Sequence, residues 1–247
     1  MIIRNEQDLE GLRKIGRIVA LAREEMKKQA KPGMTTKELD LIAKKVLDEN
    51  GAISAPEKEY DFPGTTCISV NEEVAHGMPG DRILKEGDLI NVDVSAELDG
   101  YYADTGISFV LGQDEKKEKL CKVAEDAFWA AMKKVKVGAR RNQIGRAVMN
   151  EARKNGLAVI ENLTGHGIGL SLHEEPEHIL NYFDPMDNAL LKEGLVLAVE
   201  PFISGGANHI VESGDGWTFV TPDKSLVAQC EHTIVVTKGE PIILTTL

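Results

Sequence analysis

The chain has 247 residues, of which 42% are hydrophobic and 28% charged, a composition typical of a globular protein with a sizeable core. Its formal net charge of −11 argues against nonspecific binding to nucleic acid or to an anionic membrane surface. No apolar run has the length of a membrane span, the first residues do not resemble a signal peptide, and the three cysteines are far apart. We therefore expect a cytoplasmic protein with reduced thiols and without a membrane or nucleic-acid partner.

The first part of the chain predicts two helices. Apolar residues recur every three or four positions between residues 6 and 30, which is the periodicity of an amphipathic helix. The pair Pro32-Gly33 ends this helix. Thr35 and Glu38 then form the capping-box pattern of a second helix, which is expected to stop near Gly51.

The same helical pattern returns in the second half of the chain. An apolar stripe from Leu120 to Val135 predicts a helix that ends near Gly138. Asn142 is expected to cap a further helix that runs to Gly156. Each half therefore begins with a pair of helices.

Turn signals separate short apolar segments that predict strands: Asn71-Glu72, Asp99-Gly100 and Lys238-Gly239. This pattern favours an antiparallel sheet with helices packed on its outside. Each half is predicted to contain two helices followed by strands, and no linker rich in Pro, Gly or Ser lies between the halves. We expect a single α+β domain over residues 1–247, with internal halves of about 1–115 and 116–247 around an approximate twofold axis.

Acidic residues end an apolar run at matching places in the two halves. The sequence Leu-Lys-Glu-Gly opens the run that reaches Asp93, and the same four residues open the run that reaches Glu200. Each half has a second acid inside a strand-like segment, Asp104 in the first and Glu231 in the second. An unpaired buried carboxylate is costly, and a bound pair of metal ions is the simplest way to offset that cost.

Asp93 and Asp104 flank the hairpin signal Asp99-Gly100, which would bring the two acids onto adjacent strands. Taken alone, such acids fit equally well as edge or turn residues that are hydrogen-bonded to the backbone. The matching acids of the second half favour a metal site, because structural acids have no reason to recur at matching positions.

Six histidines are present, and a lone histidine is more often a packed or solvated side chain than a ligand. His166 differs because it lies within the glycine-rich segment Thr164–Gly169, which permits close backbone approach to a site. His76 and His173 are the next candidates. Three histidines are expected to be structural or surface residues: His178, His209 and His232. One histidine with four carboxylates is an oxygen-rich donor set for two divalent ions, and it suits Mn, Fe(II) or Co better than Zn.

These motifs closely resemble the bacterial type I methionine aminopeptidases over essentially the whole chain. They occur in the order and spacing of that family: Cys67–Glu72, His76–Gly77, Asn91–Val94, Tyr102–Gly106, Thr164–Gly169, Glu200–Phe202 and Glu231–Thr233. The resemblance implies the pita-bread fold, whose pseudo-twofold halves form a curved antiparallel sheet with helices on its outer face. The insertion of the type II enzymes is missing, because only 31 positions separate Glu200 from Glu231.

The same resemblance implies a dinuclear metal centre, in which Asp104 and Glu231 would bridge the two ions. The implied ligands are Asp93, Asp104, His166, Glu200 and Glu231. The implied catalytic residues are His76, His173 and Glu200. His76 would hydrogen-bond the substrate backbone, His173 would donate to the oxygen of the scissile carbonyl, and Glu200 would carry a proton towards the leaving amine.

The implied function is removal of the N-terminal methionine from nascent proteins and peptides when the second residue is small. The methionine side chain would be bound by Phe62, Cys67, Leu172 and Trp217. Leu172 departs from relatives that carry an aromatic residue at this place. The implied partners are the N-termini of nascent polypeptides near the ribosome, and the protein is expected to act as a monomer.

Three other functions fit the sequence less well. A prolidase or an aminopeptidase P usually has a separate N-terminal domain, whereas only about 60 residues precede the motif region here. A non-catalytic binding protein on the same scaffold loses metal ligands, and all five are present in this chain. A mononuclear Fe(II) oxygenase needs two histidines and one carboxylate, which the four matched acids do not fit.

Overall fold

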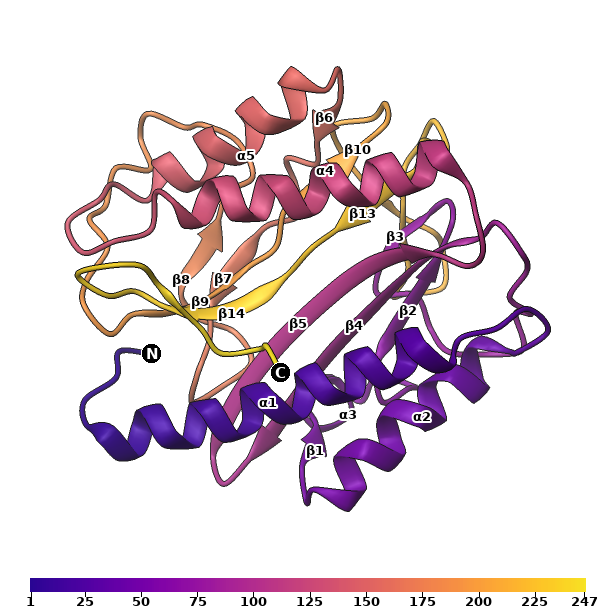
Figure 1. Ribbon diagram of the computed structural model, residues 1–247, viewed down its shortest axis with the longest axis horizontal. Coiled ribbons are helices and arrows are strands. Elements are labelled where there is room, and N and C mark those ends of the chain that lie inside the picture. The colour runs from indigo at the N-terminus through magenta and orange to yellow at the C-terminus, as the bar shows by residue number, and fades with distance from the viewer.

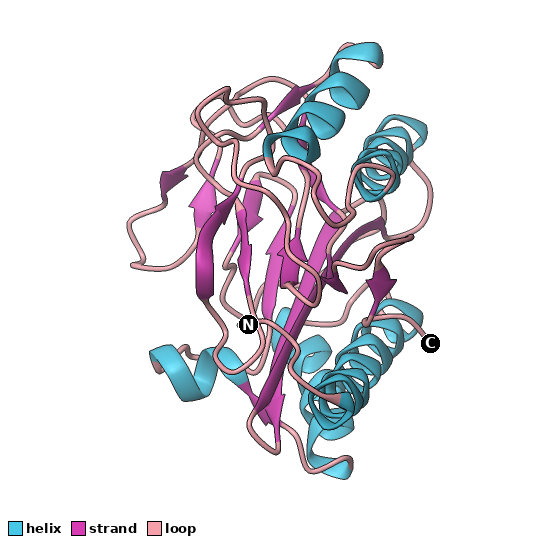
Figure 2. Cartoon of the chain, turned by 90° about the vertical axis from the view of Figure 1, so that its left-hand side faces the viewer, coloured by secondary structure: helices cyan, strands magenta, loops and turns pink.

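The computed structural model describes residues 1–247, and its strands lie between two pairs of long helices in the view of Figure 1. The helices are α1 (Glu6–Gln29), α2 (Thr36–Glu49), α3 (Ala55–Tyr60), α4 (Glu115–Met132) and α5 (Asn142–Lys154). Figure 2 shows that α3 lies on the opposite side of the strands from α1, α2 and α4. No helix combines the length and the apolar character needed to cross a membrane.

Every strand pairing is antiparallel, as the turn signals predict. The strands of the first half are β1 (Ile53–Ser54), β2 (Cys67–Val70), β3 (Glu73–Ala75), β4 (Leu89–Leu98) and β5 (Tyr101–Val110). Those of the second half are β6 (Ala158–Val159), β7 (Gly165–Gly167), β8 (Glu174–Ile179), β9 (Val196–Val199), β10 (Phe202–Ser204), β11 (Val211–Glu212), β12 (Phe219–Val220), β13 (Val227–Gln229), β14 (His232–Val235) and β15 (Ile242–Ile243). The strand orders are β1-β4-β2 with β5 on β4, β15-β14-β9-β7-β8, β13-β10-β6 and β11-β12-β3.

The predicted starts of the first two helices are confirmed by their caps. Asn5 accepts a hydrogen bond from Asp8 N at 2.9 Å and caps α1. The capping box of α2 is complete, because Glu38 N donates to Thr35 Oγ1 (3.1 Å) and Thr35 N donates to Glu38 Oε2 (2.7 Å). Both helices therefore begin with satisfied backbone donors.

Two details of the later helices differ from the sequence prediction. α4 ends at Met132, and Val135 lies in a turn in which its N–H bonds to Met132 O, three residues back, so the α-helical pattern does not continue. Asn142 does not cap α5 but is its first residue. Its side-chain nitrogen donates to Asp184 O (3.0 Å) and its side-chain oxygen accepts from Gln143 Nε2 (2.8 Å), so neither atom caps the helix backbone.

The β4–β5 hairpin turns at Asp99 and Gly100, as predicted. Asp99 has φ 53° and Gly100 has φ 85°, the two positive values that a tight two-residue hairpin turn requires. The pairing sets Asp93 opposite Gly106 and Asp104 opposite Ser95. The two acids are thus on adjacent strands, two pairs apart.

The two halves of the chain meet along β5, which runs beside β13 and β14 in Figure 1. Ile107 pairs with Cys230, and Glu231 N donates to Gly106 O at 2.8 Å. Glu231 lies in the short gap between β13 and β14, and Glu200 lies in the corresponding gap between β9 and β10. These interruptions direct acidic residues to the junction of the halves.

Each half has its own apolar core between helices and strands. The first packs α1 and α2 on β4, through residues such as Ile15, Met26, Leu39, Ile90 and Val92. The second packs α4 and α5 on β9 and β14, through residues such as Phe128, Ile144, Val148, Leu197 and Ile234. The junction that carries the acids is therefore held from both sides by packed helices.

Candidate metal centre and substrate cavity

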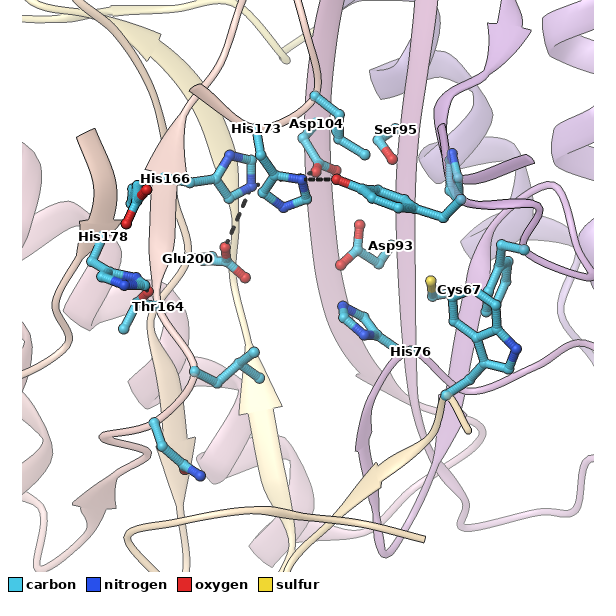
Figure 3. Close-up of a pocket in the computed structure, with 18 residues that line it drawn as sticks. Cys67, His76, Asp93, Ser95, Asp104, Thr164, His166, His173, His178 and Glu200 are labelled. Atoms are coloured by element: carbon cyan, nitrogen blue, oxygen red, sulfur yellow. Dashed lines mark hydrogen bonds and ion pairs between the residues drawn. The ribbon is translucent and has the colours of Figure 1, made fainter. Parts of the chain in front are cut away.

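A cavity of about 320 Å³ opens between the two halves. Figure 3 shows side chains entering it from strands on both sides. The polar residues that line it include Asp93, Asp104, Glu200, His76, His166 and His173. The structure thus brings residues that are up to 124 positions apart, from His76 to Glu200, around one space.

Four acids converge at this junction from different strands. Asp93 comes from β4 and Asp104 from β5, whereas Glu200 and Glu231 come from the two strand interruptions of the second half. Asp104, Glu200 and Glu231 are buried, and Asp93 is half-buried. Several buried carboxylates this close together destabilise the folded protein unless a cation or bound protons neutralise them.

His166 lies among these acids. One ligand atom from each of Asp104, His166 and Glu231 fits within 4.8 Å of the others. Nε2 of His166 is 3.9 Å from Asp104 Oδ2 and 3.8 Å from Glu200 Oε1. Nδ1 of the same ring is 3.0 Å from Gly167 O, an acceptor, so Nδ1 carries the proton and the Nε2 lone pair faces the acids.

The ionisation of these side chains fits a cation site. Burial, followed by the charges of neighbouring acids, raises the pKa values of Asp104, Glu200 and Glu231 well above their usual range. Burial lowers the pKa of His166 to about 3, so its imidazole is neutral at physiological pH. Oδ1 of Asp104 is buried without any hydrogen-bond partner. An orphaned carboxylate oxygen, clustered acids and a neutral imidazole together match the donor set of a hard or intermediate divalent metal.

A glutamine that the sequence gave no reason to single out organises the acids. Gln229 Nε2 donates to Glu200 Oε2 (3.2 Å) and to Glu231 Oε2 (3.1 Å). Its Oε1 accepts from Asn91 Nδ2 at 2.7 Å, which fixes the orientation of the amide. Gln229 therefore holds one oxygen of each glutamate in place and leaves the other two glutamate oxygens for a ligand.

His76 and His173 border the same cavity on the open side. The rings of His166 and His173 have centroids 4.1 Å apart, and the ring of His76 packs on Phe219 at 5.1 Å. The cavity walls desolvate His76 and His173 and lower the pKa of each, although both rings are exposed to the cavity. Both rings are therefore neutral hydrogen-bonding groups near neutral pH.

One end of the cavity is apolar. Phe62 and Trp217 meet edge to face with ring centroids 5.1 Å apart. Leu172 and Cys67 line the cavity with them. Burial raises the pKa of Cys67 well above its usual value, so the thiol keeps its proton and acts as a small apolar group. An unbranched, polarisable side chain matches such a recess.

Further cavity residues carry no signal that the sequence analysis used. Tyr60 OH lies 2.6 Å from Nδ1 of His173, and Thr164 Oγ1 lies 3.0 Å from Nδ1 of His178. His178, expected to be structural or on the surface, is exposed and also lines the cavity. Thr164 is the first residue of the glycine-rich segment Thr164–Gly169, but the motif gave its side chain no role. Other lining residues outside the sequence prediction are Pro56, Ser95, Asn162, Leu163 and Glu177.

Comparison with known families agrees with this geometry. The model of metallopeptidase family M24 matches residues 10–238. The chain belongs to metallopeptidase family M24. The acids and the histidine around the cavity are thus those of an M24 protein, and the resemblance read from the motifs is confirmed.

Proteins similar to this chain include several methionine aminopeptidases. The chain is 69% identical to methionine aminopeptidase 2 of Bacillus subtilis over 249 residues, with all of both chains covered. It is 58% identical to a methionine aminopeptidase of Staphylococcus epidermidis, covering 99% of this chain and 98% of that protein. The crystal structure of methionine aminopeptidase from Thermotoga maritima superposes with a TM-score of 0.96 at 35% identity and covers both chains fully. The pita-bread fold expected from the motifs is confirmed.

Proposed function

We propose that this M24 protein removes the N-terminal methionine from proteins and peptides whose second residue is small. The proposal rests on one observation: a candidate cation site and apolar side chains border the same cavity. The three relatives named above are methionine aminopeptidases, and their names support the same substrate.

Two divalent metal ions would be held by Asp93, Asp104, His166, Glu200 and Glu231. When bound, such ions supply Lewis acidity and a more acidic water at neutral pH. The oxygen-rich donor set favours Mn, Fe(II) or Co over Zn. Within this set, one oxygen each of Asp104 and Glu231 lies within 4.8 Å of a ring nitrogen of His166, so these three side chains would hold the same ion.

The remaining polar residues would act on the substrate. His173 donates a hydrogen bond to the scissile carbonyl oxygen as negative charge develops there. Glu200 would accept the proton that the attacking water releases and pass it towards the leaving amine. His76 hydrogen-bonds the substrate backbone beside the scissile bond.

The methionyl side chain would occupy the recess formed by Phe62, Cys67, Leu172 and Trp217. A second residue with a large side chain would meet the crowded junction next to the metal ligands, so Ala and Gly are accepted and Ile or Lys is not. The physiological substrates would be nascent polypeptides near the ribosome in the cytoplasm. The protein acts as a single-domain monomer in this proposal.

The test uses peptides that differ at one position. Protein reconstituted separately with Mn, Fe(II), Co or Zn is incubated with Met-Ala-Ser, Met-Ile-Ser, Leu-Ala-Ser and Xaa-Pro peptides, and mass spectrometry identifies the released residue. We expect fast release of Met from Met-Ala-Ser only, with full loss after chelation. Equal rates for Ala and Ile in the second position would refute the narrow subsite, and faster cleavage of Leu or Xaa-Pro peptides would refute the methionine assignment.

A matched pair of variants distinguishes the loss of a metal ligand from the general effect of removing one negative charge. Asp104→Asn removes one buried acid of the junction, whereas Asp126→Asn removes an acid on α4 that pairs with Lys122. We expect the first to lose bound metal and activity and the second to keep both. Retention of normal metal content by Asp104→Asn would contradict its role as a ligand.

A further inference from the structure

The phenol of Tyr60 is the one side chain that hydrogen-bonds to the ring of His173. The hydroxyl lies 2.6 Å from Nδ1, and the two ring centroids are 5.8 Å apart. The His173 ring also contacts the ring of His166, with centroids 4.1 Å apart, and Figure 3 shows these two histidines side by side. No motif or periodicity in the sequence marks Tyr60.

The local fold places Tyr60 at this point. It is the last residue of α3, whose first turn is capped by Ser54, with Glu57 N donating to Ser54 Oγ at 3.3 Å. Ser54 Oγ in turn donates to Thr65 O at 2.8 Å, which ties the start of the helix to the loop before β2. The following residue, Asp61, has φ 55°, so the chain reverses there and Tyr60 and Phe62 both reach the cavity.

The hydrogen bond has a preferred direction. At neutral pH a phenol, with an ordinary pKa of about 10, keeps its proton, and an imidazole, with an ordinary pKa of about 6.5, is mostly neutral and has one protonated and one bare nitrogen. A phenol is a good donor, and the bare nitrogen of a neutral imidazole is a good acceptor. The arrangement therefore favours a bare Nδ1 beside Tyr60 and a protonated Nε2.

We propose that Tyr60 is a positioning residue that donates to Nδ1 of His173 and thereby holds the Nε2–H of that ring towards the cavity. This inference rests on the proposed function, in which His173 donates to the scissile carbonyl oxygen. A donor that is fixed in tautomer and orientation before the reaction stabilises developing charge without further reorganisation. Without the hydroxyl, the ring is free to exchange tautomers and rotate, and only part of the protein population presents Nε2–H.

The tautomer can be observed directly, without metal and without substrate. In protein with ¹⁵N-labelled histidine, the His173 signals are assigned by their loss in His173→Ala. We expect one protonated nitrogen, Nε2, and one bare nitrogen, Nδ1, in the parent chain. In Tyr60→Phe we expect the ¹⁵N chemical shifts of Nδ1 and Nε2 to move towards values intermediate between those of a protonated and a bare nitrogen. A protonated Nδ1 in the parent chain, or unchanged spectra in Tyr60→Phe, would overturn the proposal.

Kinetics of the metal-loaded protein give the second readout. Tyr60→Phe keeps the ring and removes only the hydroxyl. We expect kcat for Met-Ala-Ser to fall about 10-fold, in the range for lost supporting contacts of active-site histidines, with KM within twofold and metal content unchanged. Tyr101→Phe is the matched control, since it removes a phenol hydroxyl that donates to Asp8 at 3.0 Å, away from the cavity.

A double-mutant cycle separates positioning from a structural effect. If Tyr60 acts through His173, adding Tyr60→Phe to His173→Ala should change kcat by less than twofold. A further 10-fold loss in that background would refute the proposal. If the parent protein loaded with metal released no methionine, the proposed function would fail, whereas the tautomer measurement would still decide the role of Tyr60.

Discussion

Asp104 and Thr233 exchange two hydrogen bonds across the junction of the halves: Asp104 N donates to Thr233 Oγ1, and Thr233 Oγ1 donates to Asp104 O, both at 2.8 Å. Asp104 belongs to β5 and Thr233 to β14. One hydroxyl therefore fixes the backbone of a candidate metal ligand to the opposite half of the chain. A threonine outside the ligand set is in this way part of what keeps the acids in register.

Replacing Thr233 by valine tests this contact. Thr233→Val keeps the shape of the side chain but leaves a buried N–H and a buried C=O of Asp104 without their partner. We expect the free energy of unfolding, measured by urea denaturation, to fall by about 1–3 kcal/mol. Thr237→Val, at an exposed turn where Thr237 Oγ1 donates to Glu240 O, should stay within about 0.5 kcal/mol of the parent. Equal effects of the two substitutions would contradict the assignment.

Gln229→Met tests whether the glutamine amide orients Glu200 and Glu231. Methionine is similar in length but donates no hydrogen bond, so both carboxylates lose the contact that fixes them. We expect metal affinity, measured by competition with a chelator, to fall about 10- to 100-fold, the usual cost of losing such a supporting contact. Gln143→Met provides the comparison, because its amide donates only to the neighbouring Asn142. Parent-like affinity in Gln229→Met would show that the glutamates hold their positions unaided.

Metal removal should destabilise the protein more as the pH rises. Burial raises the pKa values of Asp104, Glu200 and Glu231 in the metal-free folded state. Above the usual carboxyl pKa of about 4, the folded chain then binds more protons than the unfolded chain, so its stability decreases as pH increases. Bound cations replace those protons and remove the penalty. The gap in melting temperature between metal-loaded and chelated protein should widen from about pH 5 to pH 8, and a narrowing gap would refute the linkage.

Substitution of the two neighbouring histidines, His166 and His173, should affect different properties of the protein. His166→Ala removes a candidate metal ligand and should lower metal content along with activity. His173→Ala should keep metal content near normal and lower kcat on the order of 100- to 1000-fold, as for loss of a donor to a developing oxyanion. Metal analysis of both purified variants, with peptide kinetics, decides the matter. Loss of metal from His173→Ala would mean that its role is mistaken.

Local chemistry explains which features could be predicted from the sequence. The capping box of Thr35 and Glu38 and the turn at Asp99 each involve residues three or fewer positions apart, so the pattern itself contains the interaction. The four acids could be singled out because they interrupt apolar runs in both halves. The proximity of Asp93 to Asp104 then follows from the antiparallel pairing that the turn signal at Asp99-Gly100 predicts.

The features that were missed depend on contacts between distant segments. Gln229 gains its importance from Asn91, 138 positions away, and from two glutamates whose side-chain directions only the fold determines. Tyr60 is 113 positions from His173, and no periodicity marks it. Asn142 is a residue type typical of helix caps, but its side-chain nitrogen donates to Asp184 O in a distant loop and its side-chain oxygen accepts from Gln143 Nε2. The residues that flank these positions in the sequence do not indicate partners so far away along the chain.

The division of the acids between the two halves also has a consequence during synthesis on the ribosome. Asp93 and Asp104 are made first, whereas Glu231 follows 138 positions after Asp93. At a translation rate of about 5–20 residues per second, roughly 7–28 s pass between the synthesis of Asp93 and that of Glu231. During that interval the β4–β5 hairpin exposes two acids and an unpaired β5 edge to solvent. A nascent chain of this protein is therefore inactive, and it is most vulnerable to misassociation, until the segment from Gln229 to Val235 has emerged and closed the junction.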